Sequence, residues 1–329
     1  MKLIAAAQSF TAVAVDVTEV FMKKVLCLFM ALVMLCFCGC TTDPKDDGFN
    51  IVCASFAEYD WVKNLTLGTD VKVDILADTG TDMHSYQPTA ADILSISKAE
   101  LVVYNGGTAD GWMTDAIKNS GFKGKSIRIM DTIGKGLIHQ HHDDDHQILT
   151  SYVEYDEHVW LSLKNAVIAC NKIAHTLAEL DKTNQEKYNQ NCTDYVKKLE
   201  TLDKDFADAI GEGKSVVIAD RFPFLYLMTD YKLNWHAAYE GCSSETDADF
   251  EKVLSLAKTV DKEGINTLFI IEGGTDALAK TVISNTASKN QQILTLDSMQ
   301  SVTKKDIESG KNYLDTMAKN LENLKKALN

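Results

Sequence analysis

Short apolar runs alternate with amphipathic segments along two stretches of the chain, 50–182 and 213–329. The runs have the length of buried strands, and the segments between them space their apolar residues at the helical period. In the first stretch the runs are Asn50–Phe56, Val71–Leu76, Leu101–Tyr104 and Ser126–Met130. In the second they are Ser215–Ala219, Trp235–Tyr239, Thr267–Ile271 and Ile293–Leu296. This alternation predicts parallel sheets that are covered by helices.

The segment 183–212 has the pattern of one long, polar-rich helix. Thr183-Asn184-Gln185-Glu186 has the form of a capping box at its start. A helix of about twenty-five residues is about forty ångströms long at the usual rise. We therefore expect an α/β protein of two similar lobes, 50–182 and 213–329, with mostly parallel sheets and one rigid connecting helix. The chain closes with a helix predicted over Lys304–Leu328.

Residues 1–39 are typical of an export signal and lie outside the predicted fold. Met22-Lys23-Lys24 is a positively charged start, Val25–Phe37 is an apolar core of signal-peptide length, and Phe37-Cys38-Gly39-Cys40 has the form of a lipobox. We expect Met22 to be the true start, Cys40 to carry lipid, and 40–49 to be a flexible tether. An ordinary signal peptide or an uncleaved anchor is the alternative. The mature protein is then extracytoplasmic and lipid-anchored to the cell membrane.

Charge and cysteine usage narrow the class of protein. The net charge of −14 at pH 7 argues against nucleic acid as a partner, because phosphate backbones attract basic proteins. Four cysteines follow Cys40 and are widely spaced: Cys53, Cys170, Cys192 and Cys242. One disulfide among them is compatible with export, but their spacing cannot select a pairing, and four buried thiols are the alternative.

Two histidines each lie just ahead of a helical pattern. His84 lies in Asp82–Thr89, which follows the strand-like run Val71–Leu76, and His158 directly precedes the helical pattern from Val159 onward. Ligands of parallel sheets bind beyond the carboxyl ends of the strands, where the His84 loop begins. Imidazole nitrogen suits zinc, which takes about four ligands. We expect His84 and His158 to face each other across a cleft and to bind a divalent transition metal, above all zinc. The alternative is that both cap helices.

The loop 136–147 interrupts the alternation of strands and helices. It interleaves four histidines with three aspartates and has no apolar period; the histidines are His139, His141, His142 and His146. Such a composition is typical of a solvated, weakly metal-binding loop that gathers cations. A merely acidic loop is the alternative.

Together these motifs resemble the zinc/manganese-type ABC-transporter solute-binding lipoproteins, the TroA/ZnuA-like family. His84-Ser85-Tyr86-Gln87-Pro88 is similar to the family's first ligand motif, a histidine followed by an aromatic residue and a proline. His158-Val159-Trp160-Leu161 is similar to the second, and the histidine-rich insertion lies between them as in zinc members. The resemblance covers residues 50–329. It implies a monomeric, non-enzymatic receptor that captures Zn²⁺, with Mn²⁺ as the alternative metal, and delivers it to an ABC permease.

The second lobe departs from the family's pattern. A third histidine is expected directly after the first strand of this lobe, but the chain reads Ala219-Asp220-Arg221-Phe222-Pro223-Phe224 there. Protonated arginine cannot coordinate a cation. We expect Asp220 and Arg221 to shape the site or to replace a ligand, and an Arg221–Asp297 ion pair is one such arrangement. The remaining ligands are expected among four acidic residues, the first two favoured over the third: Glu245, Glu272, Asp297 and Glu240.

Two other functions are compatible with an exported metal-binding chain. A zinc hydrolase needs an open coordination position and a general base, but the sequence contains neither an HExxH motif nor a GxSxG motif. A surface adhesin of the same fold has no residue in its favour. Zinc is preferred over manganese because the expected ligands include imidazoles, whereas manganese sites favour carboxylate oxygen.

Overall fold

The structure is a computed structural model that describes residues 48–78, 80, 83–139, 155–239 and 250–329. These residues belong to one compact unit, Gly48–Asn329. Within the described ranges, no helix combines the length and the apolar character that crossing a membrane requires.

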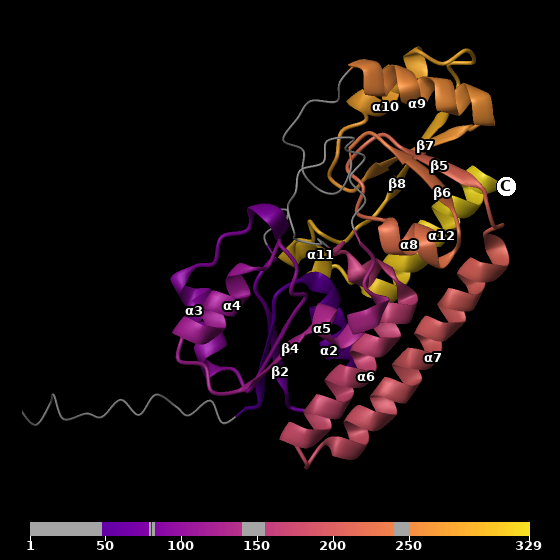
Figure 1. The fold of residues 1–329 in the computed structure, drawn as a ribbon. Helices are drawn as coiled ribbons and strands as arrows, with labels where there is room; N and C mark the ends of the chain where they lie inside the picture. The colour runs from indigo at the N-terminus through magenta and orange to yellow at the C-terminus, as the bar shows by residue number, and fades with distance from the viewer. Residues whose placement is uncertain (1–47, 79, 81–82, 140–154, 240–249) are drawn as a thin grey trace, which may run out of the picture. The chain divides into compact units, whose positions relative to one another are not determined.

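Two four-stranded parallel sheets form the framework of this unit (Figure 1). The first contains β1 (Asn50–Cys53), β2 (Lys72–Ile75), β3 (Leu101–Tyr104) and β4 (Lys125–Arg128), in the order β2-β1-β3-β4. The second contains β5 (Ser215–Ile218), β6 (Asn234–Ala237), β7 (Thr267–Ile271) and β8 (Gln292–Leu296), in the order β6-β5-β7-β8. The two sheets therefore repeat one topology, and the predicted pair of α/β lobes is confirmed.

Helices cover these sheets. In the first lobe, one helix follows each strand: α2 (Phe56–Leu65) follows β1, α3 (Ala90–Lys98) follows β2, α4 (Trp112–Asn119) follows β3 and α5 (Ile129–Ile133) follows β4. The long helices α6 (Leu163–Leu180) and α7 (Gln185–Ala209) lie side by side in Figure 1. The second lobe contains α8 (Leu225–Asp230), α9 (Phe250–Glu263), α10 (Ala277–Ser284), α11 (Lys304–Glu308) and α12 (Tyr313–Leu328). Short 3₁₀ turns are η1 (Met83–Ser85), η2 (Gly134–Gly136) and η3 (Val159–Leu161).

The strands alternate their side chains between a central core and an outer core. Along β1, Ile51 and Cys53 pack into the central core, whereas Val52 packs with residues of α3 and α4 on the other face. Along β5, Val216 belongs to the central core and Val217 to a second outer core beneath α9 and α10. Successive strand residues point to opposite faces, and both faces are buried here. This is why the central strands β1, β3, β5 and β7 are continuous apolar runs in the sequence, whereas the edge strands β2 and β4 contain exposed polar residues.

The central core joins the inner faces of both sheets. It contains apolar side chains from α2, α6, α7 and α12 as well as from the strands. At its middle, Trp61 of α2 meets Tyr313 of α12 edge to face, with ring centroids 5.4 Å apart. Because the two lobes share this packing, a wide opening between them would expose apolar surface to water.

Helix α7 contacts both lobes. Near its start, the Asn191 side chain donates to the Leu65 carbonyl of α2 at 2.9 Å. Near its end, Asp203 accepts a 2.8 Å hydrogen bond from the hydroxyl of Tyr231, which directly follows α8. The helix is somewhat shorter than the segment 183–212 in which it is predicted, and it has the position of a connector.

The predicted capping box at the start of α7 is wrong. Asn184 is the N-cap residue, and its side chain makes no capping hydrogen bond. Asp181 instead accepts hydrogen bonds from the Thr183 N–H at 3.0 Å and from the Tyr188 hydroxyl at 2.6 Å. A short aspartate side chain reaches the backbone N–H two residues onward. Asp181 therefore occupies the Thr183 N–H that the Glu186 side chain would bind in a capping box.

The predicted closing helix over Lys304–Leu328 is also wrong, because α11 and α12 are separate. Gly310 between them has φ 93°, a left-handed conformation that ends the first helix. Each helix then has its own cap: the Thr303 side chain accepts from the Asp306 N–H, and the Asn312 side chain accepts from the Asp315 N–H.

Cys53, Cys170 and Cys192 are buried free thiols in the structure. Of the two alternatives that the sequence leaves open, these three residues therefore follow the one without a disulfide. Cys242 lies outside the described residues.

Glu58, in the first turn of α2, is a carboxylate in the protein interior. Its side chain is 0% exposed; one carboxylate oxygen accepts from the Ser55 hydroxyl, and Oε1 lacks a hydrogen-bond partner among the described residues. Burial raises the pKa of Glu58 from 4.5 to about 7. The charged form is therefore disfavoured in the folded state, which is the reverse of the usual stabilising carboxylate.

This raised pKa predicts how stability depends on pH. The folded state holds a proton on Glu58 that the unfolded state releases above about pH 4.5, so the contribution of this group to stability falls between about pH 4.5 and pH 7. Glu58→Gln removes the ionisation, and its stability relative to the wild type should rise over that interval by on the order of 3 kcal/mol. Urea unfolding at several pH values measures this difference. Glu200→Gln, at an exposed position of α7, is the matched control; a difference independent of pH for Glu58→Gln would contradict the prediction.

Candidate metal centre

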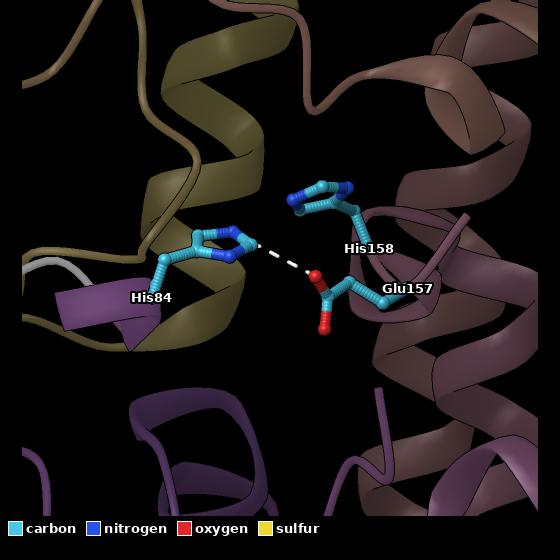
Figure 2. Close-up of side chains that lie close together, drawn as sticks. All are labelled: His84, Glu157 and His158. Atoms are coloured by element: carbon cyan, nitrogen blue, oxygen red, sulfur yellow. Dashed lines mark ion pairs between the residues drawn. The ribbon is translucent and has the colours of Figure 1, made fainter. Parts of the chain in front are cut away.

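The loop after β2 presents His84. The residue lies in η1 and its imidazole faces the beginning of η3 (Figure 2). Two interactions fix the loop behind it: the Tyr86 hydroxyl donates to Asp92 at 2.8 Å, and Thr89 and Asp92 form a capping box at the start of α3. The proline and aromatic residue after His84 thus belong to a turn that ends in a capped helix.

The second histidine is held by a carboxylate two residues before it. Asp156 Oδ1 accepts a hydrogen bond from the His158 backbone N–H at 2.9 Å and lies 3.0 Å from His158 Nδ1. Both side chains are almost fully buried. In the tautomer that carries its proton on Nδ1, His158 donates to this carboxylate and has its ring lone pair on Nε2. A histidine oriented by a carboxylate in this way is a frequent arrangement in zinc sites.

Glu157 completes a group of three possible ligands. His84 Nε2 lies 3.7 Å from Glu157 Oε1, and the rings of His84 and His158 have centroids 6.2 Å apart. One ligand atom from each of the three residues lies within 4.8 Å of the others. Figure 2 shows the three side chains converging on one point from two segments of the first lobe. Two imidazoles and one carboxylate are a suitable ligand set for zinc, which also accepts a fourth ligand.

The turn after β3 holds Glu157 in place. Its Oε2 accepts from the Ala109 N–H at 2.8 Å, and its backbone carbonyl accepts from the Asn105 side chain at 2.8 Å. A Cβ atom at Gly107 would overlap with the Glu157 carboxylate and Cβ, so this turn needs a glycine. Glu157 is not among the ligands predicted from the sequence. The signals for it were its place directly before His158 and the Gly106-Gly107 pair at a strand end.

Acidic groups crowd this end of the first sheet. Asp110 accepts two hydrogen bonds from the Gly106 N–H, at 2.9 and 3.0 Å. Burial and the nearby charge of Glu157 both raise the pKa of Asp110, to about 6. A divalent cation between the histidines and Glu157 would offset this repulsion.

The predicted acidic ligands Glu272 and Asp297 already have partners within the second lobe. Glu272 accepts from the Ser298 N–H at 2.7 Å, the Ser298 hydroxyl at 2.7 Å and the Gln300 N–H at 3.0 Å. Asp297 pairs with Lys311 at 2.6 Å, which differs from the Arg221–Asp297 pair considered from the sequence. Neither acid belongs to the three-residue group among the described residues. Their role as ligands stays a prediction.

Asp220 is part of the turn after β5. Its Oδ1 accepts from the Arg221 N–H at 2.8 Å, and its Oδ2 accepts from the Ile271 N–H at 3.3 Å. It therefore ties the ends of β5 and β7 together, close to Gly274. No described contact assigns Asp220 or Arg221 to a metal, and their predicted role in shaping the site remains a prediction.

The other predicted residues divide between described and undescribed parts of the chain. His139 stacks on Tyr155 with centroids 4.6 Å apart. His236 lies 3.4 Å from Glu263 in the second lobe. Six predicted residues lie outside the described residues: Cys40, His141, His142, His146, Glu240 and Glu245.

Two lobes, each built on a parallel sheet, and a group of two imidazoles and one carboxylate that could hold a metal ion are the features of a two-lobed metal-binding receptor. The chain belongs to the ZnuA family, described as zinc-uptake complex component A, periplasmic; the family model matches residues 51–327. The family expected from the two histidine motifs is confirmed. It is a family of receptors.

Known relatives share this architecture. The zinc-binding lipoprotein AdcA of Streptococcus pneumoniae is 28% identical over 313 residues, which cover 92% of this chain and 61% of AdcA. The metal ABC transporter substrate-binding lipoprotein ScbA of Streptococcus cristatus is 28% identical over 93% of this chain and 99% of its own. The crystal structure of the Zn(II)-bound ZnuA-like domain of S. pneumoniae AdcA matches with a TM-score of 0.68 and 27% identity, over 85% of this chain and 99% of that domain. The chain thus spans about three fifths of AdcA.

Gly107→Ala tests whether the turn after β3 positions Glu157. The added methyl group must displace the carboxylate, and zinc affinity should fall by about 10- to 100-fold, as for the loss of other groups that orient a metal ligand. Isothermal titration with zinc measures the change. Gly111→Ala is the matched control, since its Cβ would make only ordinary contacts, with the Thr108 carbonyl at 3.4 Å and the Gly107 carbonyl at 3.6 Å. Equal affinities for both variants and the wild type would contradict the prediction.

Proposed function

We propose that this chain captures Zn²⁺ with His84, Glu157 and His158 and delivers it to an ABC permease. The observation that carries the proposal is the convergence of these three side chains in a member of the ZnuA family. The zinc-binding name of AdcA and the Zn(II)-bound state of its ZnuA-like domain support zinc as the solute.

The ligand set suits capture followed by release. Three protein ligands leave one of the usual four zinc positions for another group. Glu240 and Glu245 are our proposed sources of that ligand. Glu272 and Asp297 are less suitable, because ligation would break hydrogen bonds of Glu272 or the Asp297–Lys311 pair.

Zinc is the proposed metal, and manganese is the alternative. Two imidazoles favour zinc, while additional carboxylates from the second lobe would shift the preference toward manganese. A Mn-bound relative with 24% identity has the same fold, so the fold itself does not select the metal. The choice is governed by the ligands.

Replacing the ligands tests the proposed function. His84→Ala, Glu157→Gln and His158→Ala should each weaken zinc binding by at least about 10- to 100-fold, since the loss of groups outside the coordination shell already has such effects. Binding should also weaken at acid pH, because protons compete for the imidazole nitrogens. Calorimetric titration with zinc and with manganese measures both effects.

His236→Ala is the control for these variants, because His236 is a half-buried histidine that faces Glu263 in the other lobe. It should retain wild-type affinity. Wild-type affinity in His84→Ala or His158→Ala would refute the proposed site, and hydrolytic turnover that disappears in His84→Ala would favour an enzyme instead.

We also propose that Cys40 anchors the protein to the cell membrane from outside. The lipobox at Phe37–Cys40 and the lipoprotein names of AdcA and ScbA support this. Cys40→Ser should prevent incorporation of labelled palmitate and release the protein from the membrane fraction. Cys53→Ser, at a buried thiol of the fold, is the control and should keep the label. Labelling of Cys40→Ser would contradict the anchor.

A further inference from the structure

A tyrosine of the second lobe binds the two residues that border the histidine-rich segment 139–155. Tyr226 is in α8, and its side chain is buried in the central core. Its hydroxyl donates to the Asp156 carbonyl at 2.9 Å and accepts from the Ile138 N–H at 3.1 Å. Ile138 and Asp156 precede and follow the segment 139–155. One hydroxyl of the second lobe therefore binds both ends of an insertion in the first lobe.

The two ends are also joined to each other. The Asp156 N–H donates to the Ile138 carbonyl at 2.9 Å, and His139 pairs with Tyr155 in an antiparallel bridge. The Tyr226 hydroxyl thus closes a small network of four backbone groups, the N–H and the carbonyl of Ile138 and of Asp156. Burial raises the pKa of Tyr226 to about 12, so its proton stays available as a donor at neutral pH.

This network leads directly to a proposed zinc ligand. Asp156, whose carbonyl accepts from Tyr226, uses its carboxylate to hold His158 through the backbone N–H and Nδ1. The residues that follow are also bound by the second lobe: Trp160 Nε1 donates to the Ser298 carbonyl at 2.9 Å. His158 is therefore a first-lobe ligand whose segment is held by second-lobe contacts.

We propose that Tyr226 is a positioning residue for metal binding, which orients His158 through Asp156 and couples the base of the histidine-rich segment to the second lobe. This inference rests on the proposed function. A tyrosine that served only stability would affect unfolding without changing the coordination of a bound metal. That difference makes the proposal testable.

Tyr226→Phe removes the hydroxyl and keeps the ring. Zinc affinity should fall by about 3- to 10-fold, the effect expected for loss of one or two neutral hydrogen bonds outside the coordination shell. With Co²⁺ in place of zinc, the visible absorption bands should shift, because they report the direction of the ligands around the metal. Titration calorimetry and absorption spectroscopy measure the two effects.

Tyr231→Phe is the matched control. Tyr231 is also buried and directly follows α8, but its hydroxyl donates to Asp203 of α7 at 2.8 Å. This variant should unfold at lower temperature and keep the wild-type zinc affinity and Co²⁺ spectrum. If Tyr226→Phe behaves like Tyr231→Phe, with lower stability alone or with an unchanged spectrum, the positioning role is overturned.

The unmodified protein gives a second test should Tyr226→Phe fail to fold. Coupling is reciprocal, so zinc binding should slow hydrogen exchange at the Ile138 N–H, and an unchanged exchange rate overturns the inference. The proposed function fails separately, if the wild type binds no zinc or if His158→Ala binds it normally. Zinc binding that needs His158 but ignores Tyr226 would leave the function intact and refute only the positioning role.

Discussion

The inner faces of the two parallel sheets pack into one apolar core, and the arrangement of the metal centre depends on that packing. The core fixes α2, α6, α7 and α12 against both sheets at once. Trp160, two residues after His158, belongs to the same core. The segment that contains His158 is therefore continuous with the apolar core. A receptor built in this way has little freedom for wide lobe movements, so capture and release would involve local changes around the ligands.

Carboxylates that lie close together at the end of the first sheet favour the binding of a cation, whatever the net charge of the whole protein. Glu157 and Asp110 lie close enough for the charge of Glu157 to help raise the pKa of Asp110. Charges that are removed from water interact more strongly than exposed ones. The net charge of −14 is a weaker argument, since most of it is solvated.

The sequence was sufficient for the parts of the structure that depend on local patterns. Apolar runs predicted the central strands β1, β3, β5 and β7 because both faces of these strands are buried. The motifs at His84 and His158 predicted two histidines that the structure brings close together. It was insufficient where contacts join distant residues. Glu157 depends on Asn105, Gly107 and Ala109, about fifty residues earlier, and no local pattern reports such contacts. The capping box before α7 failed because Asp181 competes for the same backbone groups.

Arg221 lies where the family's pattern has a third histidine in the second lobe. This difference is understandable if the third ligand comes from the first lobe instead. In the proposed site, a carboxylate directly before His158 supplies a ligand from the first lobe, so a histidine in the second lobe is no longer required. Two neutral imidazoles and one carboxylate leave one positive charge with Zn²⁺, and one further carboxylate would neutralise it. The second lobe would then contribute mainly by holding the ligand segment, through Tyr226 and the Ser298 carbonyl, rather than by supplying most of the ligands. In this arrangement the first lobe supplies the ligands that select the metal, and the second lobe holds these ligands in their orientation.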